Sequence, residues 1–140
     1  MNNAILITGF NGEIGRQTLL SLSKKKELII ALDINESDIK YDNVIYIKDS
    51  ILNKNIIDSI FDDYNITEIY HFAALLSQSA NENPQLAHEV NEKGSKLIIN
   101  TAMNHGKKHK SFVKIFFPSS IAVYGPRKLT HAKEQDIIKP

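Results

Sequence analysis

Short apolar runs alternate along the chain with segments whose apolar residues recur at helical spacing. The runs at 4–8, 27–33, 43–49, 68–74 and 113–117 predict strands, most of them buried on both faces. Segments 12–24, 53–64 and 84–104, the last straight or bent, predict helices with one apolar face. Pro84 suits the first turn of the third helix, and Gly106 suits the residue just after its end. Strands that alternate with helices predict the α/β class, with a doubly wound parallel sheet of order 3-2-1-4-5.

A glycine-rich loop, TGFNGEIG, joins the first predicted strand to the first predicted helix. Gly9 would permit a tight turn, Gly12 would let a pyrophosphate approach the backbone, and Gly15 would allow close helix–strand packing. Free N–H groups at the start of the helix attract phosphate charge. A glycine turn without a ligand is the alternative. The loop therefore predicts a Rossmann-type dinucleotide site that also includes Phe10, Asn11, Glu13 and Ile14.

Two carboxylates end the second and third predicted strands. Asp33 would accept hydrogen bonds from both hydroxyl groups of an adenosine ribose, and its charge would repel a 2′-phosphate. Two like charges about 4 Å apart cost about 1 to 4 kcal/mol at partly wet sites, so Asp33 favours NAD over NADP. Asp49, with Ser50 beside it, could meet the adenine amino group. For both acids, a solvated carboxylate at a strand end is the alternative.

Composition and charge exclude several classes of protein. The chain has 140 residues and a net charge of +1, so no basic footprint for nucleic acid or for an anionic membrane is predicted. It has no cysteine, which excludes disulfides, thiolate metal sites and cysteine nucleophiles. The absence of a secretory leader and of a long apolar run favours a cytoplasmic protein. No metal is expected at His105 and His109, because Gly106 should break the helix between them and three lysines surround them (Lys107, Lys108 and Lys110).

Six features together resemble the extended short-chain dehydrogenase/reductase family, which includes nucleotide-sugar epimerases and dehydratases. They are TGFNGEIG, Asp33, Asp49, HFAA at 71–74, EVNEKGS at 89–95 and PSSIAVYG at 118–125, in the order and spacing of the family. The resemblance implies NAD as the cofactor. It also implies that Asn91 holds an active-site water and the local backbone. Three residues would lie under the ribose and pyrophosphate of NAD: Phe72, Ala73 and Ala74.

The resemblance also assigns roles to three serines. Ser120, just after the fifth predicted strand, aligns with the catalytic serine or threonine of the family, whose hydroxyl bonds the substrate oxygen. Ser119 would contact the substrate, and so would Ser77, which we expect in the loop after the fourth predicted strand; ordinary loop serines are the alternative. HFAALLS, ENPQLAHEVNEKG, PSSIAVYGP and the tail IIKP resemble, more particularly, the short-chain type of L-threonine 3-dehydrogenase.

Tyr124 and Lys128 have the spacing of the family's catalytic Tyr-x-x-x-Lys pair, but we do not expect them to form it. The pair needs both side chains on one helical face, and Gly125-Pro126 between them disfavours a helix. In the threonine enzymes, the pair follows the proline equivalent to Pro140. We therefore expect residues 1–140 to be an incomplete NAD-binding Rossmann domain, truncated before the catalytic helix, with the C-terminal substrate domain absent.

Three functions follow as hypotheses. The first is an NAD-dependent oxidoreductase that converts L-threonine to 2-amino-3-oxobutanoate, with the activity of the 140-residue chain alone left open. The second is a nucleotide-sugar epimerase or dehydratase. The third is a non-catalytic, NAD-binding remnant. The expected partner is a small molecule, L-threonine or a nucleotide sugar, rather than nucleic acid or a membrane, and a homodimer is left open.

Overall fold

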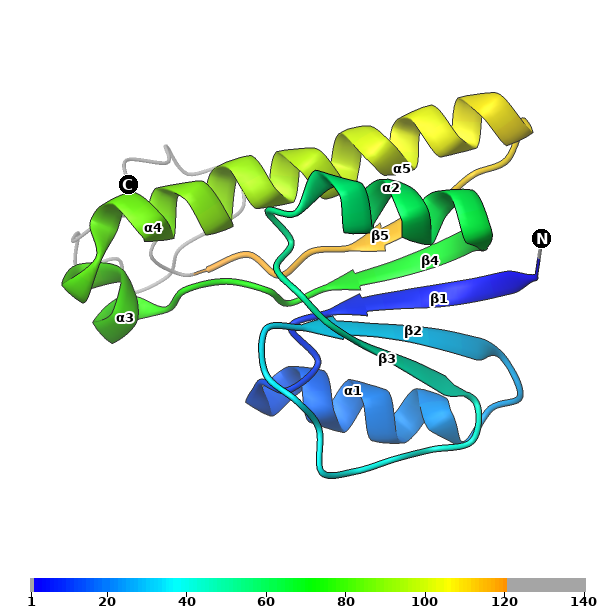
Figure 1. The fold of residues 1–140 in the computed structure, drawn as a ribbon, viewed down its shortest axis with the longest axis horizontal. Helices are drawn as coiled ribbons and strands as arrows, with labels where there is room; N and C mark the ends of the chain where they lie inside the picture. The colour runs from blue at the N-terminus through cyan, green and yellow to red at the C-terminus, as the bar shows by residue number, and fades with distance from the viewer. Residues whose placement is uncertain (1, 121–140) are drawn as a thin grey trace, which may run out of the picture.

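Five parallel strands form the central sheet of the computed structural model, which describes residues 2–120 (Figure 1). They lie in the order β3-β2-β1-β4-β5, which confirms the prediction. Because all the pairings are parallel, the carboxyl ends of the strands meet at one edge, on the left in Figure 1. The strands are β1 (Asn3–Thr8), β2 (Leu28–Asp33), β3 (Val44–Lys48), β4 (Asn65–His71) and β5 (Lys114–Phe116).

Helices cover both faces of the sheet, and the alternation of side chains along the strands explains how. Helix α1 (Glu13–Ser23) lies on one face, and α2 (Lys54–Asp63) and α5 (Ser95–His109) lie on the other (Figure 1). Leu6 and Ile30 pack in the core cluster that contains residues of α2 and α5. Ile5 and Ile29, one residue earlier on each strand, pack in the cluster that contains residues of α1. Strands β1 and β2 are therefore buried on both faces, as their continuous apolar runs predict.

The segment that follows β4 differs from the prediction. The strand begins at Asn65 and ends at His71, so residues 72–74 lie beyond it rather than within it. A short helix, α3 (Ser77–Glu82), comes next, so the prediction that Ser77 lies in a loop is wrong. The sequence of α3, SQSANE, has no apolar stripe, and hydrophobic periodicity therefore gives no signal for it.

The helix predicted over 84–104 consists of three consecutive helical segments. Helix α4 (Pro84–His88) has Pro84 in its first turn, as predicted, and the Asn83 side chain accepts a hydrogen bond from Leu86 N at 3.0 Å. The π-helix η1 (Glu89–Gly94) follows, and α5 continues directly from it. The π-helix contains one wider turn, which rotates the residues after it relative to a regular α-helix.

The predicted end of this helix, at Asn104 with Gly106 beyond it, is wrong. Helix α5 runs to His109, and Lys110 takes the left-handed conformation at its end, with φ of 50°. Gly106 lies inside the helix, where a Cβ atom would be 2.7 Å from the backbone oxygen of Ser111. This glycine is therefore explained by the close return of the chain rather than by a helix cap.

The continuous helix also changes the geometry of the two histidines near its end. His105 and His109 lie one turn apart with ring centroids 4.4 Å apart, so the prediction that Gly106 breaks the helix between them is wrong. His105 is buried, and its Nε2 lies 3.2 Å from Asn65 Oδ1. Within residues 2–120, no group of three or more His, Cys, Asp or Glu side chains is placed to hold a metal ion.

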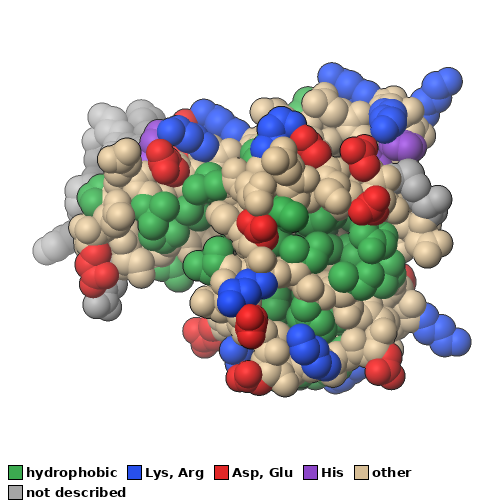
Figure 2. Space-filling view, in the orientation of Figure 1, with side chains coloured by type: hydrophobic (Ala, Val, Ile, Leu, Met, Phe, Trp, Pro, Cys, Tyr) green, Lys and Arg blue, Asp and Glu red, His purple; other side chains and the backbone are tan. Residues whose placement is uncertain are grey.

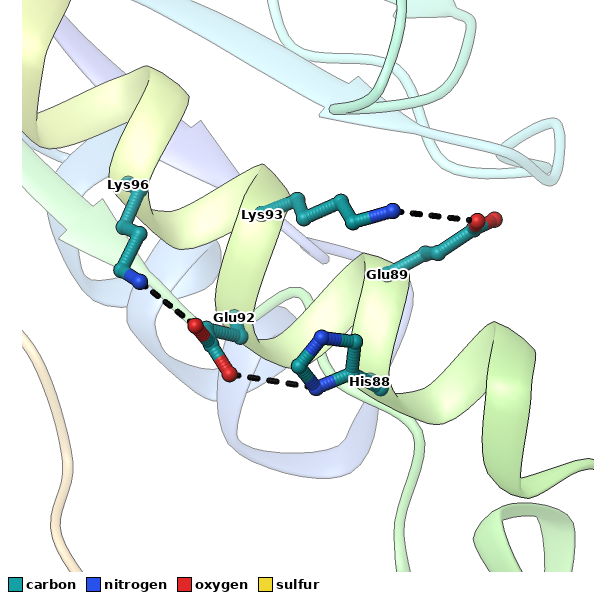
Figure 3. A network of polar contacts seen from close by, with 5 residues as sticks. All are labelled: His88, Glu89, Glu92, Lys93 and Lys96. Carbon is teal, nitrogen blue, oxygen red and sulfur yellow. Dashed lines mark hydrogen bonds and ion pairs between the residues drawn. The ribbon is translucent and has the colours of Figure 1, made fainter.

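Ion pairs on the outer surface connect the three segments of the long helix (Figure 3). Glu92 of η1 pairs with His88 of α4 at 3.1 Å and also with Lys96 of α5. Glu89 and Lys93 form a separate pair at 3.4 Å, directed away from the first group in Figure 3. The hydrogen bond and charge of Lys96 lower the pKa of Glu92. These groups are exposed, so the pairs fix local geometry and add little stability.

The charges on the visible surface do not gather by sign. In Figure 2, acidic and basic side chains are interspersed over most of this face, and apolar side chains show in the middle, between the layer of α2 and the layer of α1. Among the helices of the described residues, none is long and apolar enough to cross a membrane.

Candidate functional site

A cavity of about 280 Å³ opens at the carboxyl ends of β1, β2 and β4. This edge is where the chain order of a doubly wound sheet reverses, because β1 has β2 on one side and β4 on the other. The glycine loop, the ends of β2 and β3, and the segment after β4 supply its walls. The structure brings nine predicted residues together in the lining: Gly9, Asn11, Gly12, Asp33, Asp49, Ser50, Phe72, Ala73 and Ala74.

Two glycines are required by the close packing of the loop itself. Gly9 has φ of 69°, and a Cβ atom there would lie 2.5 Å from Ala73 N. At Gly15, a Cβ atom would lie 2.3 Å from the backbone oxygen of Gly9. Gly15 therefore lets α1 pack against the loop that precedes it, whereas the sequence predicts close packing against a strand. Both glycines hold the loop in one conformation.

The remaining glycine of the loop, Gly12, is not required by the fold. Gly12 has extended backbone angles, φ −70° and ψ 168°, which suit any residue. A Cβ atom there would meet only the backbone oxygen of Gly9, at an ordinary 3.4 Å. As the N-cap residue of α1, Gly12 provides no side chain to cap the first-turn N–H groups. The open space and the uncapped N–H groups are the two features that an approaching phosphate needs.

Backbone hydrogen bonds hold the Asp33 carboxylate at the end of β2. Its Oδ2 accepts from Asn11 N at 2.9 Å, and its Oδ1 accepts from Asn35 N at 2.9 Å. Each carboxylate oxygen can accept a further hydrogen bond, so two donors on a ligand could still reach Asp33. The carboxylate is thus held in one position at the cavity wall, as a group that hydrogen-bonds to a ribose must be.

Asp49 and Ser50 line the cavity and also form hydrogen bonds within the chain. The Asp49 carboxylate accepts hydrogen bonds from Ser50 N at 2.7 Å and from Asn53 Nδ2 at 3.1 Å. Ser50 Oγ accepts from Leu52 N at 3.1 Å. These bonds shape the turn from β3 into α2. Contact of either residue with adenine stays a prediction.

Comparison with known proteins agrees with this arrangement. Residues 5–140 match the NAD dependent epimerase/dehydratase family. The chain belongs to this family. NAD is therefore its cofactor, and the glycine loop and Asp33 lie at the cavity where the fold predicts a dinucleotide.

Relatives within the epimerase/dehydratase family carry different activities in their names. The human protein called inactive L-threonine 3-dehydrogenase, mitochondrial, is 31% identical over 87% of this chain and 52% of its own length. The UDP-glucose 4-epimerase of Halalkalibacterium halodurans is 31% identical over 95% of this chain and 39% of its own length. A solved structure of a monomeric L-threonine 3-dehydrogenase from a metagenome has 35% identity and a TM-score of 0.74, over 87% of this chain and 38% of its own. The chain thus spans about half the length of such relatives, or less.

The structure does not bring every predicted site residue of this family member into the cavity lining. Phe10 is only 2% exposed, and its side chain packs in the core beside α1. Ser119 and Ser120 are exposed beyond the end of β5, outside the lining. Tyr124 and Lys128 lie outside the described residues. The other predicted residues outside the lining are Glu13, Ile14, Gly15 and Asn91.

Asn91 nevertheless has a definite role beside the cavity. Its Oδ1 accepts from Leu75 N at 2.8 Å, and its Nδ2 donates to Leu75 O at 2.9 Å. The side chain thus holds both polar groups of one backbone residue in the cavity wall. This matches the part of the expectation that concerns backbone geometry, while an active-site water stays a prediction.

Six lining residues were not identified from the sequence. Most adjoin a predicted residue along the chain, so extending each predicted strand end by one or two positions would have found them. Val90 adjoins the predicted residue Asn91 but lies in the π-helix η1, for which the sequence pattern gives no signal. The six are Leu32, Ile34, Asn35, Ile51, Leu75 and Val90.

Proposed function

We propose that residues 1–140 are the NAD-binding Rossmann portion of an oxidoreductase that acts on a secondary alcohol. The observation that carries this proposal is the cavity that combines an open glycine loop with the fixed carboxylate of Asp33. A turn without a ligand would not need the space at Gly12, whose backbone angles suit any residue. We also propose that this Rossmann domain is incomplete, because the chain spans only part of the length of its relatives.

The cavity residues fit the parts of NAD in turn. The N–H groups at the start of α1 would hold the pyrophosphate beside Gly12. Asp33 would accept hydrogen bonds from the adenosine ribose. Ala73 and Ala74, whose side chains are small, would leave room beneath the pyrophosphate and the second ribose. When bound, NAD supplies an acceptor for the hydride that leaves the hydroxyl-bearing carbon of a substrate.

For the substrate, we propose L-threonine, oxidised at C3 to 2-amino-3-oxobutanoate. Support comes from the solved threonine dehydrogenase with 35% identity and from the loop sequences around 71–77 and 118–126. Ser120 would bond the substrate oxygen, and Ser119 and Ser77 would contact the substrate. The identity of 31% with a UDP-glucose 4-epimerase over 95% of the chain supports a nucleotide-sugar epimerase or dehydratase as the second candidate. A non-catalytic NAD-binding protein is the third.

The preference for NAD over NADP tests the role of Asp33. We expect the parent chain to bind NAD at least about fivefold more tightly than NADP, since 1 kcal/mol of charge repulsion corresponds to about fivefold. Asp33→Ala should weaken the binding of NAD and make the affinities for NAD and NADP more nearly equal. Both dinucleotides would be titrated by calorimetry at one salt concentration.

Glu36→Ala is the matched control for this experiment. It removes the same charge from the loop after β2, where Glu36 pairs with Lys48 at 2.9 Å and does not line the cavity. The control should keep the preference of the parent. Equal or tighter binding of NADP by the parent would overturn the assignment of Asp33.

A further inference from the structure

A buried chain of hydrogen bonds joins three elements that adjoin the cavity, yet none of its side chains lines it. His71 Nδ1 lies 2.6 Å from Thr8 Oγ1, and His71 Nε2 lies 2.8 Å from Ser95 Oγ. Thr8, His71 and Ser95 are 0%, 1% and 5% exposed. Thr8 ends β1, His71 ends β4 and Ser95 begins α5, so a single imidazole connects two strands and a helix.

Packing alone does not explain three polar side chains at these positions. Burying a polar group costs free energy unless it is hydrogen-bonded, and an apolar side chain, such as Ile69 earlier in β4, avoids that cost. Burial lowers the pKa of His71 to about 4, so the ring is neutral at pH 7. With a bond at each nitrogen, the orientation of the ring is fixed. What the three polar groups add over an apolar core is a defined distance between their elements.

Each of the three elements leads directly into a wall of the cavity. Gly9 follows Thr8 and lies so close to Ala73 that a Cβ atom at position 9 would be 2.5 Å from Ala73 N. Phe72 follows His71, and its N–H donates to Thr8 O at 2.9 Å. Ser95 follows η1, from which Val90 lines the cavity and Asn91 holds Leu75. A shift between these elements would change the width of the cavity.

We propose that His71 is a positioning residue of the cofactor site, which touches no cofactor and fixes the glycine loop, the segment after β4 and η1 relative to one another. The effect of His71 on NAD affinity rests on the proposed function. Its effect on the cavity walls concerns the protein without a ligand and can be measured separately. Neither effect follows from the predicted roles of the cavity residues themselves.

A triple variant separates positioning from stability. His71→Phe alone would leave two buried hydroxyl groups without a partner, which is costly in itself. In Thr8→Val/His71→Phe/Ser95→Ala, all three polar groups are removed together, so the melting temperature should stay close to that of the parent. Amide hydrogen exchange without ligand should nevertheless become faster at Gly9, Ala73 and Leu75, by about tenfold or more, as the local opening free energy falls. NAD binding should weaken by about tenfold, as expected for a displaced binding wall.

Ile69→Val is the matched control, because it removes one buried methylene from β4 without touching the hydrogen-bond chain. It should lower the melting temperature and leave the exchange at Ala73 and Leu75, just beyond β4, unchanged relative to the amides within β4. If the folded triple variant matches the parent in exchange at these amides, His71 serves packing only and the proposal is overturned. If the parent does not bind NAD, the proposed function fails, while the exchange measurement still decides the role of His71.

Discussion

Gly12→Val is expected to abolish NAD binding and keep the fold, whereas Gly9→Val is expected to prevent folding. The two positions belong to one loop but differ in their surroundings. Gly12 has extended angles, and a Cβ atom there would meet its nearest neighbour, the Gly9 oxygen, at 3.4 Å, so the protein can accept the side chain. The branched side chain would then occupy the space where the pyrophosphate must approach. We expect a loss of affinity of more than about 100-fold, or roughly 2.7 kcal/mol.

Gly9 has no such freedom. Its φ of 69° is disfavoured for any residue with a Cβ atom, and that atom would lie 2.5 Å from Ala73 N and 2.7 Å from Ala73 Cα. The strained backbone costs about 1 to 3 kcal/mol, and overpacking costs a similar amount. Together they remove a large part of the 5 to 15 kcal/mol by which a typical domain is stable. Circular dichroism melts and NAD titration of both variants test the contrast. A stable Gly9→Val variant, or a Gly12→Val variant that binds NAD as the parent does, would contradict it.

The 140-residue chain by itself is expected to show little or no NADH production with L-threonine, even when it binds NAD. Loss of hydride from the substrate carbon requires removal of the hydroxyl proton, and a positioned acid–base group accelerates that step about 100- to 10,000-fold. In its proposed role Ser120 would orient the oxygen, but a serine hydroxyl is itself too weak a base to take the proton at neutral pH. Tyr124 is not expected to take the proton, because Gly125-Pro126 disfavours the helical turn that would bring Lys128 beside it.

Absorbance at 340 nm, the NADH band, would measure this difference between the 140-residue chain and a chain extended through a Tyr-x-x-x-Lys segment and a C-terminal domain. The extended chain should turn over L-threonine and should lose activity on Ser120→Ala, with about 3 to 4 kcal/mol of transition-state stabilisation removed. Tyr124→Phe is the matched control and should have little effect on either chain. Robust turnover by the short chain that disappears on Tyr124→Phe would show that Tyr124 is the catalytic residue.

The hydrophobic pattern was sufficient to predict the sheet order. Glycine spacing, the acids at strand ends and the family resemblance together predicted most of the cavity lining. Buried parallel strands such as β2 are continuous apolar runs, and Asp33 is the first residue after the apolar run of β2 and the last residue of that strand. The strand, its end and the site residue can therefore all be recognised in one short stretch of sequence. The glycine loop is local for the same reason. By contrast, α3 has no apolar stripe, and at the end of α5 the backbone of Ser111 returns against Gly106. Such tertiary contacts leave no periodic signal.

The hydrogen-bond chain through His71 shows the same limit for a site. Thr8 stands out as a polar residue directly after the apolar run of β1, which is a signal that it needs a partner. His71 ends a strand, NITEIYH, that contains other polar residues and so gives a weaker signal. Their pairing, however, depends on the register of β1 with β4, in which Thr8 lies opposite His71. Ser95 joins them only because α5 crosses this end of the sheet. Sequence can mark such residues as unusual, but only the fold shows what they connect.

The central claim is that NAD binds in the cavity at the carboxyl ends of β1, β2 and β4. An NMR titration of the isotope-labelled chain with NAD tests it most directly, because each backbone amide reports separately. We predict saturable shift changes at Gly12, Glu13, Asp33 and Ala73, while amides at the far end of the sheet, such as Asn43, keep their positions. The absence of saturable changes, or changes centred away from the glycine loop and Asp33, would contradict the account.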